Sequence, residues 1–427
     1  MTSAPTEQKR KEAAVALLKS METTASRMRE LIVAMPAKDL LGYIYAQRMI
    51  KVSMDQIAIS TDHNADENDD LPEDIINETQ FLLEYVHAVL ASDTAFAEVR
   101  FDETQCAELF ELSHKLKDEA MFFAMATSAD TKDGIFGPGT ADIEFHAKSN
   151  WLLIRGNRHQ VLEGEFYCYV LAPHDDILKD VYGAGASEIA AGFQDMADAT
   201  RLGQANAIDK MMEQFEEAKA FAAEQKKPLE EAMRAWVAEN VDQSRAASLA
   251  MDDMFRGGIA NVSRHTNLPT NLLADLSYER GEETEFYAAG DYAGTPYRTL
   301  PARKKPLIKL GTDYYAVDPC FARDAGYRAL LYNLLKRKPD YKKEFEARQK
   351  LMSEGAFFDI LAKQLSGASV YQEVYYKDPK TKQWSENDAL VLMDDVLFLV
   401  EAKAGAAATI ASPALDFERH AQSVQDL

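Results

Sequence analysis

Apolar residues at helical spacing dominate the first two thirds of the chain. Between residues 8 and 50 they recur every three or four positions, and Pro36 interrupts the pattern. A break is also expected at Pro228, within a region whose repeated Ala, Met, Glu and Gln favour helix. The further helical stretches are Ile75–Ser92, Thr104–Thr127 and Ser187–Met254. This part of the chain is therefore expected to be mostly helical.

Strand-like patterns begin after a Gly-rich connector, Asp133–Thr140. The expected strands of this region are Asp142–Phe145, Trp151–Arg155, Val161–Leu162 and Glu165–Leu171. Another strand is expected at Lys309–Val317. A long helical stretch, interrupted near Pro339, then runs to about Leu365.

The C-terminal region reads as helix, three strands and helix. The helix Gly355–Leu365 precedes a strand at Ser369–Tyr376 and a polar turn at Asp378–Trp384. Two fully apolar runs follow, which is typical of strands buried on both faces. The runs are Ala389–Met393 and Val396–Val400, with Asp394-Asp395 as the turn between them, and a last helix is expected at Asp416–Leu427.

The turn between the two apolar runs determines which of their residues face each other. If it closes an antiparallel hairpin, Asp388 lies directly opposite Glu401. Directly opposed residues share one side of a sheet, and strand alternation places Lys403 on that side as well. The sequence therefore predicts two carboxylates and one ammonium at the end of two strands.

Two opposed carboxylates repel each other unless a cation lies between them. Hard oxygen ligands suit Mg²⁺ or Mn²⁺, which also accept phosphate oxygens. Asp388 and Glu401 are therefore the predicted metal ligands, and Lys403 is the predicted group that orients water or stabilises developing charge. The alternative is a solvated hairpin rim with a Lys403–Glu401 surface ion pair.

This arrangement resembles the PD-(D/E)XK (restriction-endonuclease-like) nuclease superfamily. The family's first acidic ligand matches Asp388, although Asn387 stands where many members have Pro, and its Glu-X-Lys matches Glu401-Ala402-Lys403. Many members also carry an acid on the first helix, which implies Asp359 as a catalytic residue and Glu354 as the second choice. The resemblance covers about 75 of the 427 residues and implies phosphodiester hydrolysis.

The family's last core strand has no counterpart before Leu427. A sheet that lacks a final neighbour leaves backbone groups exposed along one edge. We therefore expect the natural polypeptide to continue, or another chain to supply the strand, either a second copy or a partner protein.

Charge is distributed unevenly along the chain. The net charge is −23, but Arg298–Lys350 carries a balance of +8, and this basic segment directly precedes the nuclease-like region. An acidic protein is not expected to bind nucleic acid over its whole surface, so contacts with phosphates are expected from this segment. The expected nucleic-acid-binding residues are Arg303, Lys304, Lys305, Lys336, Arg337 and Lys338. The alternative is a solvated helical face that is basic.

Three widely separated cysteines, an N-terminus without a signal-peptide pattern, and the lack of any run of about 18 apolar residues favour a cytoplasmic protein without a membrane segment. The expected fold class is α+β. It comprises a helical domain (1–132), a β-containing then helical middle region (133–290), a basic connector (291–350) and an incomplete nuclease-like αβββα core (351–427). The expected function is Mg²⁺- or Mn²⁺-dependent cleavage of nucleic acid, with DNA preferred to RNA. The alternative is a non-catalytic interaction or scaffold protein that carries a degenerate nuclease domain.

Overall fold

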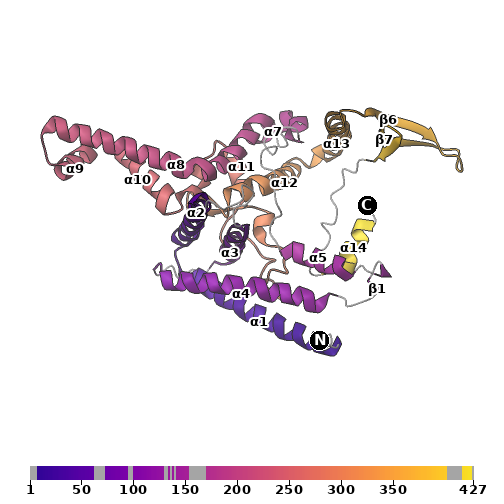
Figure 1. Ribbon diagram of the computed structural model, residues 1–427, viewed down its shortest axis with the longest axis horizontal. Helices are drawn as coiled ribbons and strands as arrows, with labels where there is room; N and C mark the ends of the chain where they lie inside the picture. Colours follow the sequence, from indigo (N-terminus) through magenta and orange to yellow (C-terminus); the bar gives the residue numbers. More distant parts are fainter. Residues whose placement is uncertain are drawn as a thin grey trace. The chain divides into compact units, whose positions relative to one another are not determined.

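The computed structural model describes residues 7–61, 73–94, 100–128, 133–134, 137–138, 141–152, 170–401 and 416–425 (Figure 1). The chain forms two compact units. Unit 1 comprises residues 1–159, 191–330 and 410–422, and unit 2 comprises residues 160–190, 331–409 and 423–427.

The helices are α1 (Glu7–Ala34), α2 (Ala37–Thr61), α3 (Glu73–Ser92), α4 (Glu103–Thr127), α5 (Ala141–Leu152), α7 (Asp175–Tyr182), α8 (Ala186–Gln225), α9 (Leu229–Glu239), α10 (Val241–Phe255), α11 (Thr270–Asp275), α12 (Pro319–Arg337), α13 (Lys342–Gln364) and α14 (Phe417–Gln425). Short 3-10 turns are η2 (Ala172–His174), η3 (Gly258–Ala260), η4 (Val262–Arg264), η5 (Pro301–Arg303) and η6 (Pro339–Tyr341). The strands are β1 (Asp133–Gly134), β2 (Gly137–Pro138), β3 (Ser277–Tyr278), β4 (Leu307–Leu310), β5 (Asp313–Ala316), β6 (Ser369–Lys377), β7 (Trp384–Met393) and β8 (Val396–Val400).

Helix α3 forms the centre of unit 1. Every residue from Thr79 to Ala91 is buried, as expected for a helix surrounded by packing partners. Helices α1 and α4 pack along each other, and α2 packs against α3 (Figure 1). The one buried imidazole of α3, His87, has its Nε2 3.0 Å from the Leu307 carbonyl oxygen of β4, which ties the helix to the small sheet of this unit.

That small sheet has the order β3-β4-β5. Strands β3 and β4 are parallel, with Tyr278 opposite Ile308, whereas β4 and β5 form an antiparallel hairpin. The hairpin turn includes Gly311, whose φ of 72° lies in the left-handed region that glycine adopts without steric cost. The sequence had predicted one strand over Lys309–Val317, which is wrong because this turn divides the segment.

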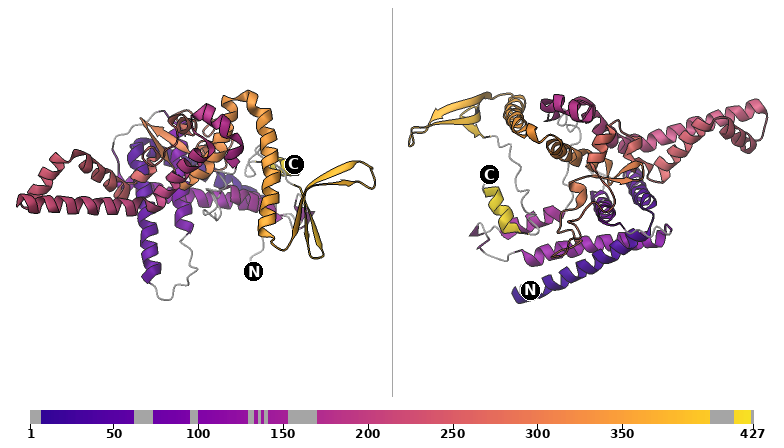
Figure 2. Two further views of the ribbon diagram at one scale, coloured as in Figure 1. Left: turned by 90° about the horizontal axis from the view of Figure 1, so that it is seen from above. Right: turned by 180° about the vertical axis from the view of Figure 1, so that it is seen from behind.

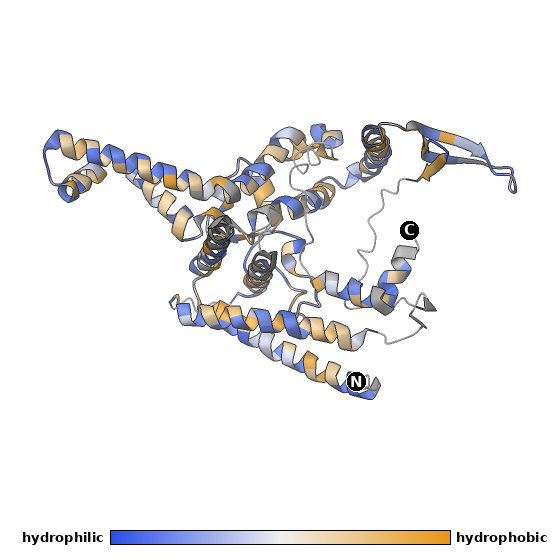
Figure 3. Ribbon diagram, viewed as in Figure 1, coloured by the Kyte–Doolittle hydropathy of each residue, from blue (hydrophilic) through white to orange (hydrophobic). Residues whose placement is uncertain are grey.

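Helices α8, α9 and α10 make an arm in which α8 runs outward and the other two return beside it (Figures 1 and 2). The Gln214 side-chain amide of α8 donates a hydrogen bond of 2.9 Å to the Gln243 carbonyl oxygen of α10. Hydrophobic residues recur along α8 in the hydropathy view (Figure 3). Ala218 faces inward and is buried, whereas Met212 and Phe215 are exposed.

Unit 2 contains a second sheet, with the order β6-β7-β8 and antiparallel pairing throughout. Helix α13 packs against β6 and β7, and its N-terminal part contacts η2. His174 of η2 holds this second contact. Its ring stacks on Phe345 with centroids 4.7 Å apart, and its Nδ1 lies 2.6 Å from the Tyr341 hydroxyl.

The α+β class is confirmed, with helices in the N-terminal region and the longer strands near the C-terminus. The strand predicted at Asp142–Phe145 is wrong, because this segment lies in α5. There the pair Glu144–Lys148, four residues apart and 2.7 Å between charged atoms, supports a helix. The strands expected at Trp151–Arg155 and Glu165–Leu171 are wrong where the structure describes them, because Trp151 and Leu152 lie in α5 and Val170 and Leu171 are helical. The remaining residues of the expected strands, 153–169, lie outside the described residues. The four-segment division of the chain stays a prediction.

Strand β7 begins at Trp384, so the polar turn predicted over Asp378–Trp384 is one residue shorter at its end. The helix breaks predicted at Pro36, Pro228 and near Pro339 are confirmed, since each proline lies between two helices or in the short turn that joins them. In the described part of the chain, no helix combines the length and the apolar character that crossing a bilayer requires.

The buried imidazole of His174 predicts an acid-sensitive attachment of α13. Its Nε2 accepts a hydrogen bond of 2.7 Å from the Gln349 amide, so the neutral ring carries its proton on Nδ1. Burial lowers the pKa of His174 to about 4 from the ordinary 6.5. Between these values the unfolded chain binds the extra proton and the folded chain does not. The contribution of His174 to the free energy of unfolding is therefore fully present above about pH 6.5 and is lost as the pH decreases towards 4.

Hydrogen exchange in α13, corrected for the intrinsic pH dependence of exchange, should show less protection at pH 5 than at pH 7. In His174→Gln the side chain keeps a donor and an acceptor but does not titrate, so this difference should shrink. Equal pH dependence in the wild type and the variant would assign the effect to other groups.

Candidate active site

The β7–β8 hairpin has the register predicted from its turn. Met393 pairs with Val396, and the ladder continues to Ala389 opposite Val400. Asp394 takes the left-handed backbone conformation at the turn, with φ of 50°, which Asp tolerates better than most residues. The predicted antiparallel closure is therefore confirmed over these five pairs.

One step beyond the last of these pairs, Asp388 and Glu401 are the next residues in register. Asp388 is half-buried on β7, and Glu401 is exposed directly after β8. Residues opposed in this way have Cβ atoms about 4.5–5.5 Å apart. The hairpin thus brings together the two predicted metal ligands, whereas Lys403 lies outside the described residues and its role stays a prediction.

The two faces of this sheet differ in their environment. On β7 the buried side chains are Asn387, Ala389 and Val391, and they alternate with half-buried or exposed neighbours. Because α13 packs against β6 and β7, we assign the buried face to this helix. Asp388 belongs to the opposite face, which we call the open face.

The open face is apolar next to the carboxylates. Its residues on β8 are Leu397, 53% exposed, and Leu399, 60% exposed, and Leu392 of β7 lies opposite Leu397. On the other face of β8, Phe398 is also 47% exposed. The prediction of two strands buried on both faces is therefore wrong, because β7 is buried on one face only, with Leu392 41% exposed, and no described element covers β8.

Glu373 of β6 is an acidic residue that the sequence pattern did not single out. The β6–β7 register pairs Gln372 with Ala389 and Val374 with Asn387, so Glu373 is the residue across from Asp388. Its φ of 52° interrupts the ladder at that point. A non-glycine residue in the left-handed region costs conformational energy and is enriched at functional sites. No sequence signal marked it.

The acid expected on the first helix does not join this group. Asp359 is exposed on α13, which we assigned to the other face of the sheet. Glu354, the second choice, pairs with Lys350 at 3.4 Å. Among the described residues, no group of three or more His, Cys, Asp or Glu side chains lies close enough to hold a metal ion.

Two opposed carboxylates nevertheless suit one kind of metal. Mg²⁺ is commonly held by one or two carboxylates, with waters and substrate phosphates completing its coordination. Asp388 and Glu401 match this donor set, because both offer hard oxygen ligands from one face of one hairpin. A closed site made of protein ligands alone, such as structural zinc requires, does not fit them.

The basic segment is divided between the two units. Arg303, Lys304 and Lys305 belong to unit 1, and Lys336, Arg337 and Lys338 belong to unit 2. In unit 1, Lys304 pairs with Glu285 and Lys305 pairs with Glu282. Arg303 is half-buried, and burial lowers the pKa of its guanidinium.

In unit 2 the corresponding cations are exposed. Lys338 pairs with Asp180, and the Arg337 guanidinium lies 5.8 Å from the centre of the Tyr182 ring. These three residues belong to the same unit as Asp388 and Glu401.

In comparisons with known proteins, the chain matches no family profile, no curated sequence and no solved structure.

The two faces of the sheet should respond differently to substitution. Val391 is 1% exposed on the covered face, so Val391→Ala should destabilise unit 2 by about 2 kcal/mol, because it leaves a cavity against the helix. Leu399→Ser on the open face should change stability by less than about 0.5 kcal/mol. Urea unfolding of the full chain measures both. A larger loss from Leu399→Ser would show that the open face is covered in solution.

Proposed function

We propose that unit 2 is a metal-dependent phosphodiesterase that cleaves nucleic acid, with DNA as the first substrate class. The observation that supports this proposal is the β7–β8 register, whose continuation beyond the Ala389–Val400 pair sets Asp388 opposite Glu401 on the open face. Glu401 also begins the Glu-X-Lys sequence, so the two acids and Lys403 occur in the order that the nuclease resemblance requires.

Each residue has a distinct part in this chemistry. The Asp388 and Glu401 carboxylates would hold a divalent ion on the open face, where substrate can approach. Mg²⁺ or Mn²⁺ bound there supplies electrostatic stabilisation of the phosphate and lowers the pKa of water. Lys403 donates hydrogen bonds to the attacking water or to a non-bridging phosphate oxygen.

A second function has one observation in its favour. Val396, Leu397, Phe398 and Leu399 are all about half-exposed on an edge strand, and an apolar edge favours pairing with another strand. This supports the interaction-protein alternative, in which the hairpin binds a protein and performs no chemistry. The two proposals differ in whether Asp388 and Glu401 matter for the activity.

We expect the full-length chain to cleave DNA with Mg²⁺ or Mn²⁺. Asp388→Asn and Glu401→Gln keep side-chain size but remove one negative charge from the predicted ligands. Each should lower the cleavage rate about a hundredfold or more, and so should Lys403→Ala. The double variant should lose less cleavage rate than the product of the two single losses, because removing either ligand already disables the shared metal site. Linear duplex, nicked duplex and single-stranded RNA should be tested in parallel.

Glu386→Gln is the matched control for these variants. Glu386 is on the same strand, two residues before Asp388, but its carboxylate accepts a hydrogen bond of 3.0 Å from the Tyr375 hydroxyl. The Glu386→Gln variant should cleave DNA at the wild-type rate. Calorimetric titration with Mn²⁺ adds a second readout, in which Asp388→Asn loses a site that Glu386→Gln keeps. If the wild type neither cleaves nor binds Mn²⁺, the interaction-protein alternative replaces the nuclease.

The two basic groups should contribute unequally to DNA affinity. Each phosphate contact adds about 0.9 to the slope of log affinity against log salt concentration. Replacing Lys336, Arg337 and Lys338 by Gln should flatten this slope more than replacing Arg303, Lys304 and Lys305, because the latter lie in the other unit, two of them paired with glutamates. An equal effect of the two triple variants would contradict this assignment.

A further inference from the structure

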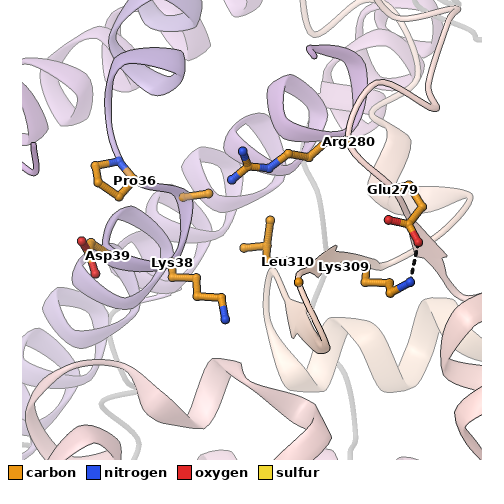
Figure 4. Close-up of a pocket in the computed structure, with 9 residues that line it drawn as sticks. Pro36, Lys38, Asp39, Glu279, Arg280, Lys309 and Leu310 are labelled. Carbon is orange, nitrogen blue, oxygen red and sulfur yellow. Dashed lines mark hydrogen bonds and ion pairs between the residues drawn. The ribbon is translucent and has the colours of Figure 1, made fainter. Parts of the chain in front are cut away.

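Unit 1 contains a cavity of about 640 Å³ that is lined only by residues of this unit, whereas Asp388 and Glu401 belong to unit 2 (Figure 4). Three segments far apart in the sequence line it. They are the first turn of α2 with its preceding residue (Pro36–Asp39), the residues directly after β3 (Glu279 and Arg280), and the end of β4 with its turn (Lys309–Gly311). This volume lies within the usual range for pockets that hold small molecules.

The fold explains why these segments meet. Strands β3 and β4 are parallel, so their carboxyl ends lie at one edge of the sheet. Continuing their register beyond Tyr278 and Ile308 places Glu279 beside Lys309 and Arg280 beside Leu310. Lys38, Arg280 and Lys309 thus line the cavity from three separate parts of the chain, and Figure 4 shows Lys309 turned towards Glu279.

Three cations around one cavity are notable in a chain of net charge −23. Two carboxylates, Asp39 and Glu279, also line the cavity. Lys309 pairs with Glu279 at 2.6 Å, and Lys38 pairs with Asp313 at 3.0 Å. Both pairs are partly exposed, and such pairs contribute little to stability, so an incoming anion can exchange with a carboxylate at low cost.

The side-chain donors of Lys38, Arg280 and Lys309 suit phosphate in particular. Arg280 is engaged in the structure, as the two lysines are, and on exchange its planar guanidinium matches two phosphate oxygens while the two ammonium groups provide point charges. Pro36 accepts the first hydrogen bond of α2, from the Leu40 amide at 3.0 Å, and has no side-chain group to cap the amides that follow. These amides add further donors to a site that the three cations already define.

We propose that this cavity binds a phosphorylated small molecule, with its phosphate groups held by Lys38, Arg280 and Lys309. The site needs neither Asp388 nor a metal ion, so the test of this proposal does not depend on whether the chain is a nuclease. It gives unit 1 a ligand-binding role of its own.

The test is calorimetric titration of the full-length protein with inorganic pyrophosphate, at low salt and without divalent metal. Pyrophosphate is chosen because two linked phosphates reach more than one cation. We expect saturable binding of one pyrophosphate per chain. Arg280→Gln should weaken it about tenfold or more, and Lys38→Gln and Lys309→Gln should each weaken it measurably.

Two matched variants separate this site from general charge effects. Lys304→Gln removes a paired, exposed cation from the same unit outside the cavity and should leave binding unchanged. Glu279→Gln removes a carboxylate that competes for Lys309, so it should tighten binding about threefold. Thermal melting of every variant should match the wild type, since none of these side chains is in the core.

Three outcomes would overturn the proposal. They are the lack of saturable binding, an equal loss in Lys304→Gln and Arg280→Gln, and displacement of bound pyrophosphate by stoichiometric duplex DNA. The last would make the cavity part of a nucleic-acid surface.

Discussion

The pairing register of the β7–β8 hairpin is the constraint on which the proposed chemistry depends. Because side chains alternate between faces, a slip of one residue would move Asp388 to the face that packs against α13. Ala389 and Val391 are each 1% exposed, and their burial makes such a slip costly. Ordinary apolar packing therefore determines where the carboxylates point, and the two-residue turn determines which residue lies opposite each of them.

The arrangement of charged residues is harder to predict than the hairpin register, since their position along the chain says little about their position in space. The basic segment divides between two units, and Lys304 and Lys305 pair with Glu285 and Glu282. Paired charges produce a weak field beyond about a Debye length. Distance along the chain is equally uninformative, since Lys38 and Lys309, about 270 residues apart in sequence, line one cavity of unit 1.

The sequence predicted correctly those features that depend on a few neighbouring residues, such as the ends of helices. Prolines end helices because they lack an amide donor, so the breaks at Pro36 and Pro228 could be read directly. The segment Asp142–Phe145 was too short to separate helix from strand by periodicity, and in the structure it lies in α5, where the Glu144–Lys148 pair supports the helix. Exposure of β8, the left-handed backbone at Glu373 and the cavity all depend on contacts between distant segments. No pattern within one segment reports such contacts.

The open face combines two features that constrain each other. Leu392 and Leu397 form a pair near the turn of the hairpin, whereas Asp388 and Glu401 lie four residues further along, roughly 13 Å away. Apolar surface near the turn is costly to expose and favours cover by another element. Carboxylates that act on a polymer must stay accessible. Whatever covers this face must therefore lie over the half next to the turn, and substrate must approach the half that ends at Glu401. A cover that extended over the whole face would serve the interaction-protein alternative, because it would close the access that catalysis needs.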